Sequence, residues 1–437
     1  MKYRKHRGLK ISEIGIGTYS LSGVYGKKDL KEFGRMIHRA HELGVNFFDT
    51  AEAYGDAERI LGELLKPFRE EIHIATKVGV KRGIKPNLSR QYVKEACEES
   101  LKRLQTDYID LYQVHFHDPT TPVEETVQAL EELVEEGKIR FYGVGHLPLD
   151  VTEEYCRLGQ PFSLLAEFSA VARESHGRLL PLCREYDLGI IAFSTTGRGL
   201  LTGRFKEGQR FEPGDIRHLD PLFQRERLQY GLRIAEKFAE LGEWYGRTPA
   251  QVALAWVLAH QGIVCALCGP STVEHLEENA GASGWKFPEE DMRELEEFFE
   301  KEEGLLRERQ RESIKQILTQ PLREPQRAFV DLIYVIETAL YLGLVDEEEV
   351  LPVFYELYGL RGKLGGGEAA GILREIDRFV REHFALRESA RRKASSPDTY
   401  RRVLRRFAAV TGAEAVRGVS ARDIRRFAAY LLSLIHI

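Results

Sequence analysis

Eight short β-forming runs alternate with eight amphipathic helical patterns between residue 11 and about residue 302. Strands that alternate with helices of about ten to fifteen residues predict consecutive βα units around a parallel sheet. Eight units over about 290 residues match the size and order of a closed (β/α)₈ TIM barrel. The predicted strands span 11–17, 46–51, 72–78, 109–115, 139–145, 164–169, 188–194 and 263–269. The predicted helices span 28–43, 57–67, 89–104, 123–136, 150–158, 178–186, 249–259 and 273–283.

An open, doubly wound sheet is the alternative for a chain in which strands and helices alternate. Such a sheet would carry the glycine-rich turn G-x-G-x-x-G between its first strand and its first helix. The first predicted strand runs into GIGTYSLSG, and this segment does not open a helix. The sequence therefore favours the barrel.

The 437 residues divide into three predicted parts. The barrel is expected over residues 1–304, and the charged, helix-patterned stretch 305–390 predicts an all-helical C-terminal extension. Residues 391–437 form a basic helical tail, with 11 Lys and Arg but only 3 Asp and Glu between Arg391 and Tyr430. The tail is thus a separate electrostatic unit in a chain whose net charge is only −5.

Residues 396–432 of the tail read as two capped amphipathic helices. The segment SPDTYRRVLRRF…VSARDIRRFAAYLL weakly resembles the start of the core-binding domain of tyrosine recombinases, which implies phosphate contacts to DNA. The alternative is a helix pair that packs against protein. The final LSLIHI resembles the translation of a sequencing-adaptor end, so we predict a truncated or read-through frame, and nucleic acid is a partner only if the tail is natural.

Composition narrows the cellular setting. No apolar run approaches the eighteen or so residues that a membrane span needs, and basic residues near the N-terminus are not followed by an apolar stretch. An odd number of irregularly spaced cysteines does not indicate a disulfide framework, so we expect a cytoplasmic protein. The cysteines are Cys97, Cys156, Cys183, Cys265 and Cys268.

Four polar residues stand at or just after the ends of predicted strands. Asp49 ends the second strand and Tyr54 lies in the loop after it, while Lys77 ends the third strand and His115 the fourth. In a (β/α)₈ barrel the loops after the strands share one mouth, where catalytic groups lie. We therefore expect these four side chains at one site.

The four residues suit the reduction of a carbonyl group, which takes a hydride from a nicotinamide and a proton from the protein. Tyr54 can supply the proton, and the Lys77 ammonium is expected to lower the pKa of the phenol from its usual value near 10. Asp49 would hold Lys77 and balance its charge. A neutral His115 would donate a hydrogen bond to the carbonyl oxygen, so the set needs no metal.

Several motifs across residues 8–300 resemble those of the aldo-keto reductases. The resemblance implies an NAD(P)H-dependent oxidoreductase that reduces aldehydes or ketones, with Tyr54 as acid, Lys77 and Asp49 tuning it, and His115 orienting the substrate. The motifs are FFDTAEAYGDAERILGELL, IATKVG, LYQVHFHDP, LVEEGKIRFYGVG, GRGLLTGRF and HLEENAGA.

The same resemblance implies a nucleotide site in which Phe193 stacks on the nicotinamide, the following loop lines the pyrophosphate and the segment after the last strand holds the adenosine. The implied cofactor-binding residues are Gly17, Thr18, Asp49, Phe193, Ser194, Leu200, Gly203, Gly269, Ser271, His275, Glu278 and Asn279. At the substrate mouth we expect an insert over 206–228 that forms a mobile loop. The substrate residues are expected to be Tyr19, Tyr25 and His146.

Three motifs depart from the family pattern, at four positions. Gly145 and His146 replace a Ser-Asn pair, and Leu165 replaces a Gln, all of which hold the nicotinamide amide. Ser271 replaces a basic residue that pairs with the ribose 2′-phosphate, although NADP(H) is still expected over NAD(H). A shifted cofactor, a replacement contact from His146 or slow turnover would each follow. The alternative function is a regulatory or binding subunit that senses nicotinamide nucleotide.

Overall fold

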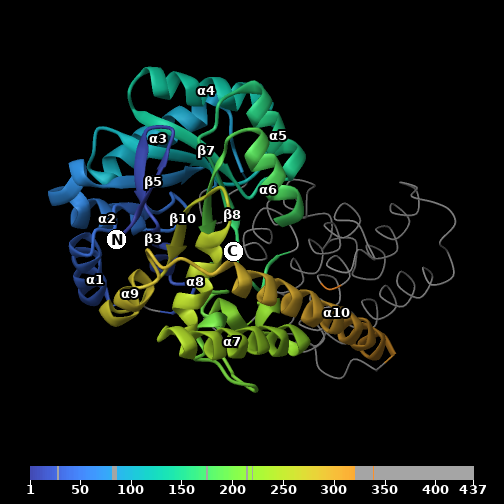
Figure 1. Ribbon diagram of the computed structural model, residues 1–437. Helices are drawn as coiled ribbons and strands as arrows, with labels where there is room; N and C mark the ends of the chain where they lie inside the picture. The colour runs from blue at the N-terminus through green and yellow to red at the C-terminus, as the bar shows by residue number, and fades with distance from the viewer. Residues whose placement is uncertain are drawn as a thin grey trace, which may run out of the picture. The chain divides into compact units, whose positions relative to one another are not determined.

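The computed structural model describes residues 1–26, 29–80, 86–173, 176–212, 215–218, 220–319 and 338. Its centre is a closed barrel of eight parallel strands in the order β10-β3-β4-β5-β6-β7-β8-β9 (Figure 1). The predicted (β/α)₈ barrel is therefore confirmed. The barrel strands are β3 (Ile14–Gly17), β4 (Phe47–Asp49), β5 (His73–Val78), β6 (Ile109–Val114), β7 (Ile139–Gly145), β8 (Ser163–Glu167), β9 (Gly189–Phe193) and β10 (Ile263–Cys268).

Helices surround the barrel, and eight of them correspond to the predicted patterns (Figure 1). Local sequence starts them: Asp29 caps one helix by accepting from two backbone amides, and Thr248 with Gln251 forms a complete capping box on another. These helices are α1 (Leu30–Glu42), α2 (Ala57–Leu65), α3 (Arg90–Leu104), α4 (Val123–Glu135), α5 (Leu149–Leu158), α6 (His176–Glu185), α8 (Pro249–Ala259) and α9 (Val273–Ala280).

The predicted first strand, 11–17, is divided in the structure. Its beginning belongs to β2 (Leu9–Ser12), which pairs antiparallel with β1 (Tyr3–His6), and the barrel strand β3 begins only at Ile14. Arg4 of this hairpin donates to the carbonyl oxygen of Ile263, where β10 begins. The hairpin therefore packs at the N-terminal end of the barrel, opposite the expected active site.

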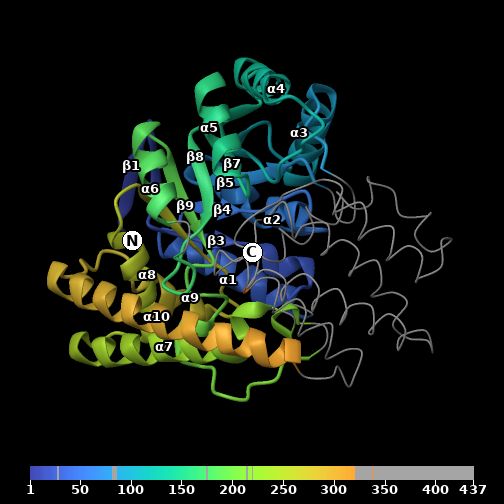
Figure 2. The ribbon, with the colours of Figure 1, turned by 90° about the vertical axis from the view of Figure 1, so that its right-hand side faces the viewer.

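One helix was not predicted, nor was the first half of another that continues into the helical extension predicted from residue 305. The segment 206–228, expected to be a mobile loop, contains the start of α7 (Arg225–Tyr245), and α10 (Glu289–Thr319) follows the barrel. Figures 1 and 2 both show α7 and α10 side by side. An ion pair between Lys237 and Glu294 (2.6 Å) and an edge-to-face contact between Phe238 and Phe299 join them.

The barrel interior is filled by apolar side chains. Ile191, Leu111 and Cys265 belong to one buried cluster there, and a Cβ added to Gly15 would lie only 2.7 Å from Cys265 Sγ. Cys265 is thus a core residue at a position where its neighbour must be glycine. Cys268, at the end of the same strand, is also buried.

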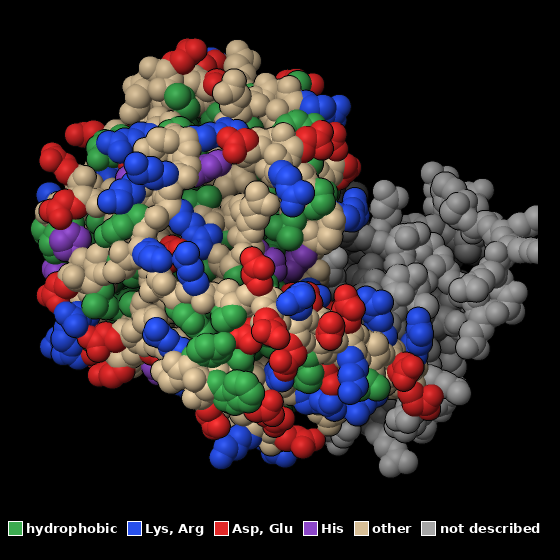
Figure 3. Space-filling view, in the orientation of Figure 1, with side chains coloured by type: hydrophobic (Ala, Val, Ile, Leu, Met, Phe, Trp, Pro, Cys, Tyr) green, Lys and Arg blue, Asp and Glu red, His purple; other side chains and the backbone are tan. Residues whose placement is uncertain are grey.

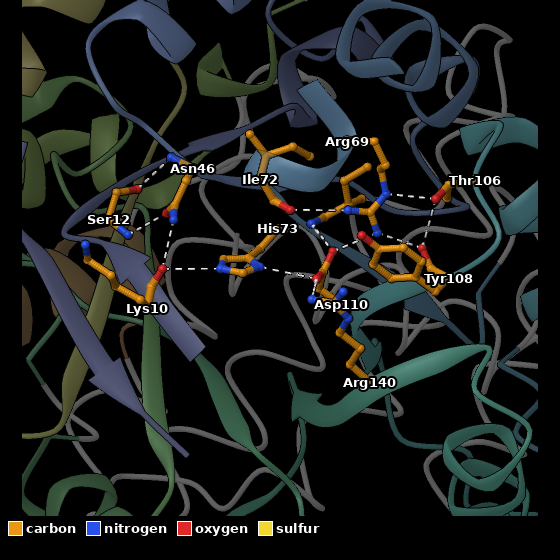
Figure 4. A network of polar contacts seen from close by, with 11 residues as sticks. Lys10, Ser12, Asn46, Arg69, Ile72, His73, Thr106, Tyr108, Asp110 and Arg140 are labelled. Carbon is orange, nitrogen blue, oxygen red and sulfur yellow. Dashed lines mark hydrogen bonds and ion pairs between the residues drawn. The ribbon is translucent and has the colours of Figure 1, made fainter. Parts of the chain in front are cut away.

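A polar network fixes the N-terminal end of the barrel (Figure 4). Asp110 of β6 is fully buried and accepts from Arg69 at 2.8 Å, Arg140 at 3.1 Å, His73 at 3.2 Å and the backbone amide of Ile74 at 3.0 Å. His73 also contacts the Lys10 carbonyl oxygen of the β1–β2 hairpin, at 3.2 Å. One carboxylate therefore links three strands, the segment before β5 and, through His73, the hairpin.

The surface shown in Figure 3 carries Lys and Arg side chains interspersed with Asp and Glu. Within the described part of the chain, no helix is both long and apolar enough to span a bilayer. The predictions for the helical extension beyond residue 319, for the basic tail and for nucleic acid lie outside the described residues.

Candidate active site

The C-terminal ends of β4 and β5 place a buried ion pair. Lys77 Nζ lies 2.5 Å from Asp49 Oδ1 and donates a second hydrogen bond to the Thr50 carbonyl oxygen at 2.7 Å. The side chains of Lys77 and Asp49 are 1% and 5% exposed. Because both charges are removed from water, each depends on the other for its stability.

Tyr54 and His115 lie beside this pair. Lys77 Nζ is 4.9 Å from the centroid of the Tyr54 ring, and the Tyr54 and His115 ring centroids are 5.8 Å apart. The structure therefore brings together all four residues that the sequence predicted.

The predicted lowering of the Tyr54 pKa from its usual value near 10 is wrong for this structure. Burial raises the pKa of Tyr54 well above its usual value, and the Asp49 carboxylate raises it further. The physical reason is that burial outweighs the stabilisation that the Lys77 ammonium gives to the phenolate, because Asp49, 2.5 Å from Lys77, offsets part of the field of the ammonium. Tyr54 consequently stays protonated, as a proton donor must.

His115 is neutral. Burial lowers the pKa of its imidazole well below the usual value, and the charge of Lys77 acts in the same direction. Neither ring nitrogen has a hydrogen-bond partner among the described residues, although the side chain is buried. A neutral imidazole with free nitrogens can donate to a substrate oxygen.

Gln113 was missed by the sequence analysis. Its amide Nε2 donates to the second oxygen of Asp49, Oδ2, at 3.2 Å, and Gln113 pairs in register with Lys77 across β5 and β6. The signal was present in the strand: side chains two residues apart share a face, so Gln113 points the same way as core residue Leu111. A buried amide in an otherwise apolar row indicates a polar partner.

Part of the implied cofactor site lies where β3, β4 and β10 end. Thr18 donates to the Asp49 carbonyl oxygen through its backbone amide (2.9 Å) and its hydroxyl (3.0 Å). A Cβ built on Gly17 would lie 3.8 Å from the Cys268 carbonyl oxygen, and one on Gly269 would lie 3.8 Å from the Gly17 carbonyl oxygen. The structure thus brings Gly17, Thr18, Asp49 and Gly269 together.

The loop after β9 has the backbone of a tight turn. Ser194 has a φ of 55°, and its buried hydroxyl lacks a hydrogen-bond partner among the described residues. Leu200 is fully buried in the 3₁₀ helix Leu200–Thr202, and Gly203 ends that helix with a φ of 74°. Phe193, half-buried, ends β9 just before this loop.

The implied adenosine side lies at the start of α9. Thr272 caps this helix by accepting from the His275 amide, which leaves Ser271 exposed just ahead of it. Arg204, which the sequence analysis missed, contacts His275 and forms an ion pair with Glu278, while Asn279 is half-buried nearby on the same helix. A basic side chain therefore reaches this region from the loop after β9.

Aromatic rings line the route outward from Tyr54. The Tyr19 ring centroid is 5.0 Å from that of Tyr54 and 6.1 Å from that of Tyr25. Tyr25 forms an isolated β-bridge with Asp215 of the insert, and Arg217 packs over the Tyr25 ring. The insert thus meets the loop after β3 next to the residues predicted to contact substrate.

A scan against family models decides the identity: residues 13–300 match the model of the aldo/keto reductase family. The chain belongs to this family. It is therefore an NAD(P)H-dependent oxidoreductase that acts on aldehydes or ketones, as the motifs implied.

Individual aldo/keto reductases agree with this assignment. Aldo-keto reductase str7 of Strobilurus tenacellus is 35% identical over 306 residues, covering 67% of this chain and 90% of the relative. A probable aldo-keto reductase 1 of Glycine max is 36% identical over 297 residues, covering 66% and 86%.

Solved aldo/keto reductase structures share the barrel. A glycerol dehydrogenase of Gluconobacter oxydans superimposes with a TM-score of 0.63 at 27% identity, covering 68% of this chain and 94% of its own. An aldo/keto reductase of Klebsiella pneumoniae in complex with NADP and acetate gives a TM-score of 0.55 at 26% identity, covering 68% and 95%.

Two departures from the aldo/keto reductase pattern are coupled in space. Gly145 and Leu165 face each other in the β7–β8 register, and a Cβ on Gly145 would lie 3.0 Å from that of Leu165. The serine usual at position 145 would therefore crowd Leu165. His146 has a φ of 50°, and its ring centroid lies 4.9 Å from that of Phe193 and 5.5 Å from that of His115.

Proposed function

We propose that this aldo/keto reductase reduces its carbonyl substrate by using Tyr54 as the proton donor and NADPH as the preferred hydride source. The observation that carries the proposal is the buried Lys77–Asp49 pair beside a protonated Tyr54 and a neutral His115. These groups form a complete acid and hydrogen-bond donor set.

The residues at the C-terminal end of the barrel suit a nicotinamide nucleotide. The Ser194 hydroxyl, which has no partner in the described part of the chain, and the left-handed backbone at Gly203 suit a loop that wraps closely around phosphate oxygens. Phe193 offers a ring at the end of β9. When bound, the nucleotide supplies the hydride.

The protein's own groups handle the substrate oxygen. His115 and Tyr54 donate hydrogen bonds to the carbonyl oxygen, and as negative charge develops there the Tyr54 hydroxyl transfers its proton. The Lys77 ammonium then stabilises the phenolate, while Asp49 holds Lys77 in place. The carbonyl carbon gains the hydride, the oxygen gains the proton, and the product is an alcohol.

The preference for NADPH rests on Arg204. The position at which the family has a basic residue is Ser271 here, but Arg204 reaches His275 and Glu278 on α9. A guanidinium can pair bidentately with a 2′-phosphate. We also place the protein in the cytoplasm, because all five cysteines have free thiols, as a reducing compartment maintains them.

The experiment compares consumption of NADPH and NADH by the full chain and by Tyr54→Phe, with reactive aldehydes and quinones as substrates. Loss of the acid should reduce kcat by a factor of about 10² to 10⁴, while nucleotide affinity, measured by fluorescence quenching, stays unchanged. Turnover that survives in Tyr54→Phe would contradict the assignment of the donor. Nucleotide binding without turnover in the wild type would instead support the nucleotide-sensing alternative, which the matches to reductases do not favour.

A further inference from the structure

Asp49 is held from two sides. Lys77 Nζ lies 2.5 Å from Oδ1, and Gln113 Nε2 donates to Oδ2 at 3.2 Å. Asp49, Lys77 and Gln113 come from three consecutive strands, β4, β5 and β6, and Gln113 is fully buried. The contact to Gln113 is therefore set by the register of the barrel and not by a flexible loop.

The chemistry of the amide makes this contact specific. An ionised carboxylate only accepts hydrogen bonds, so the amide nitrogen of Gln113, and not its oxygen, must face Asp49. In that orientation the amide oxygen, Oε1, has no hydrogen-bond partner among the described residues. Leaving a buried carbonyl oxygen unpaired costs free energy. The orientation that leaves Oε1 unpaired is the one in which Nε2 donates to Asp49.

We propose that Gln113 is a positioning residue of the reductase site, an inference that rests on the proposed function. Its amide fixes the ionised carboxylate of Asp49, and Asp49 in turn holds the Lys77 ammonium beside the Tyr54 ring. Among the described residues the side-chain hydrogen bond of Gln113 goes to Asp49 and not to Tyr54, so its effect on the reaction passes through the ion pair.

Electrostatics explains why the pair needs this help. Burial raises the pKa of Asp49 and lowers that of Lys77, so both shifts favour transfer of the proton from the ammonium to the carboxylate. The hydrogen bond from Gln113 lowers the pKa of Asp49 and opposes that transfer. A neutral amine at position 77 could not stabilise the Tyr54 phenolate.

The first test compares steady-state reduction by the wild type, Gln113→Leu and Gln113→Met, both of which lack a donor and the second of which nearly preserves the length of the side chain. We expect kcat to fall by about tenfold or more, with KM for nucleotide and substrate within about twofold. The control is Tyr112→Phe on the opposite face of the same strand, which removes a buried hydroxyl that has no hydrogen-bond partner among the described residues and should leave kcat unchanged.

Gln113→Glu gives a signature that a merely structural role would not. The carboxyl group that this substitution introduces can still donate to Asp49 while it is protonated, whereas its ionised form repels the Asp49 carboxylate. We therefore expect kcat of Gln113→Glu to fall with rising pH through an ionisation that the wild type lacks.

An infrared measurement tests the inference without turnover. The protonated-carboxyl stretch assigned to Asp49, by its loss in Asp49→Asn, should be stronger in Gln113→Leu and Gln113→Met than in the wild type at neutral pH. If the wild type does not turn over, the proposed function fails while this spectrum still tests Gln113. The inference would be overturned if both donor-free variants kept the kcat of the wild type and Gln113→Glu kept its pH profile. Spectra of the donor-free variants identical to that of the wild type would also overturn it.

Discussion

The two ends of the barrel treat a buried aspartate in opposite ways. At the N-terminal end, Asp110 receives hydrogen bonds or ion pairs from Arg69, His73, Arg140 and one backbone amide (Figure 4). At the C-terminal end, the side chain of Asp49 receives two contacts among the described residues, from Lys77 and Gln113. The same residue type is over-supplied with donors at one end and minimally supplied at the other.

The difference appears in the acidity of the two groups. Burial opposes ionisation of Asp110, yet the His73 hydrogen bond and the Arg69 charge hold its pKa below the usual value. Burial raises the pKa of Asp49, and Lys77 offsets that only in part. A carboxylate with a lowered pKa stays ionised and is a fixed anchor, whereas the charge of a carboxylate with a raised pKa depends on the few partners that hold it. The comparison therefore assigns Asp110, at the N-terminal end of the barrel, to stability and Asp49, at the C-terminal end, to function.

The largest expected effect is at the anchored end. Asp110→Ala leaves the Ile74 backbone amide and the largely covered Arg69 guanidinium without their carboxylate and should lower the free energy of unfolding by about 3 kcal/mol. Activity per folded molecule should not change, because the active site is at the other end. Urea unfolding measures the first quantity, and Asp107→Ala, three residues earlier and exposed, is the matched control. Equal unfolding of the two variants would show that the network adds no stability.

We expect His115→Phe to lower activity and to leave stability almost unchanged, the reverse of Asp110→Ala. Neither nitrogen of His115 has a hydrogen-bond partner among the described residues, so a phenyl ring removes no hydrogen bond, and the free energy of unfolding should stay within about 1 kcal/mol of the wild type. Turnover should fall by a factor of about 10² to 10³, as for the loss of one oxyanion donor.

The control is His176→Phe, since burial also lowers the pKa of His176 to about 3 but this residue lies on α6 and stacks on Phe168. Its kcat should equal that of the wild type. Strong destabilisation by His115→Phe would mean that His115 is an anchor and not a poised donor.

The sequence predicted those features of the two ends of the barrel that depend on local patterns along the chain. Alternating strands and helices predicted the barrel, and the strand-end rule predicted that Asp49, Tyr54, Lys77 and His115 meet, because both depend on local patterns and a fixed topology. The division between β2 and β3 was missed because no Gly or Pro marks a turn between Leu9 and Ile14, and only tertiary pairing separates the two strands at Glu13.

The missed features depend on contacts between distant segments. Arg204 and Glu278 are 74 residues apart, and nothing near either residue in the sequence indicates the ion pair. The pKa of Tyr54 was predicted in the wrong direction because burial depth is a property of the fold and not of the adjacent lysine. A sequence can therefore place catalytic residues on strands more reliably than it can set their acidity.

Arg204 extends the comparison between groups that stabilise the fold and groups that serve function. Its exposed guanidinium contacts His275 and Glu278 and could do either. If it binds the 2′-phosphate, Arg204→Gln should raise KM for NADPH by about tenfold, equivalent to about 1.4 kcal/mol, with little change for NADH. The nearby exposed Lys206, changed to Gln, should alter neither value. An equal change with both nucleotides would assign Arg204 to the structure of the loop and leave the NADPH preference without support.

The smallest expected effect is in the pH dependence of the free energy of unfolding, which should differ between variants at Asp110 and variants at Asp49. Because the pKa of Asp110 is below the value of about 3.9 for an unfolded chain, the unfolded state binds more protons. Its contribution is therefore present above that value and is lost as pH falls through the folded pKa. The raised pKa of Asp49 has the opposite sign, so that its protonation stabilises the folded state as pH falls. The free energy of unfolding of the wild type exceeds that of Asp110→Asn, and this difference should shrink below about pH 4, by about 1 kcal/mol per pH unit. For Asp49→Asn, the difference in the free energy of unfolding should shift in favour of the wild type on acidification, by a similar amount per pH unit.

Urea midpoints between pH 3 and pH 7 would measure both. Parallel gaps would mean that the two carboxylates do not differ in acidity, and the contrast between the two ends of the barrel would then rest on geometry alone.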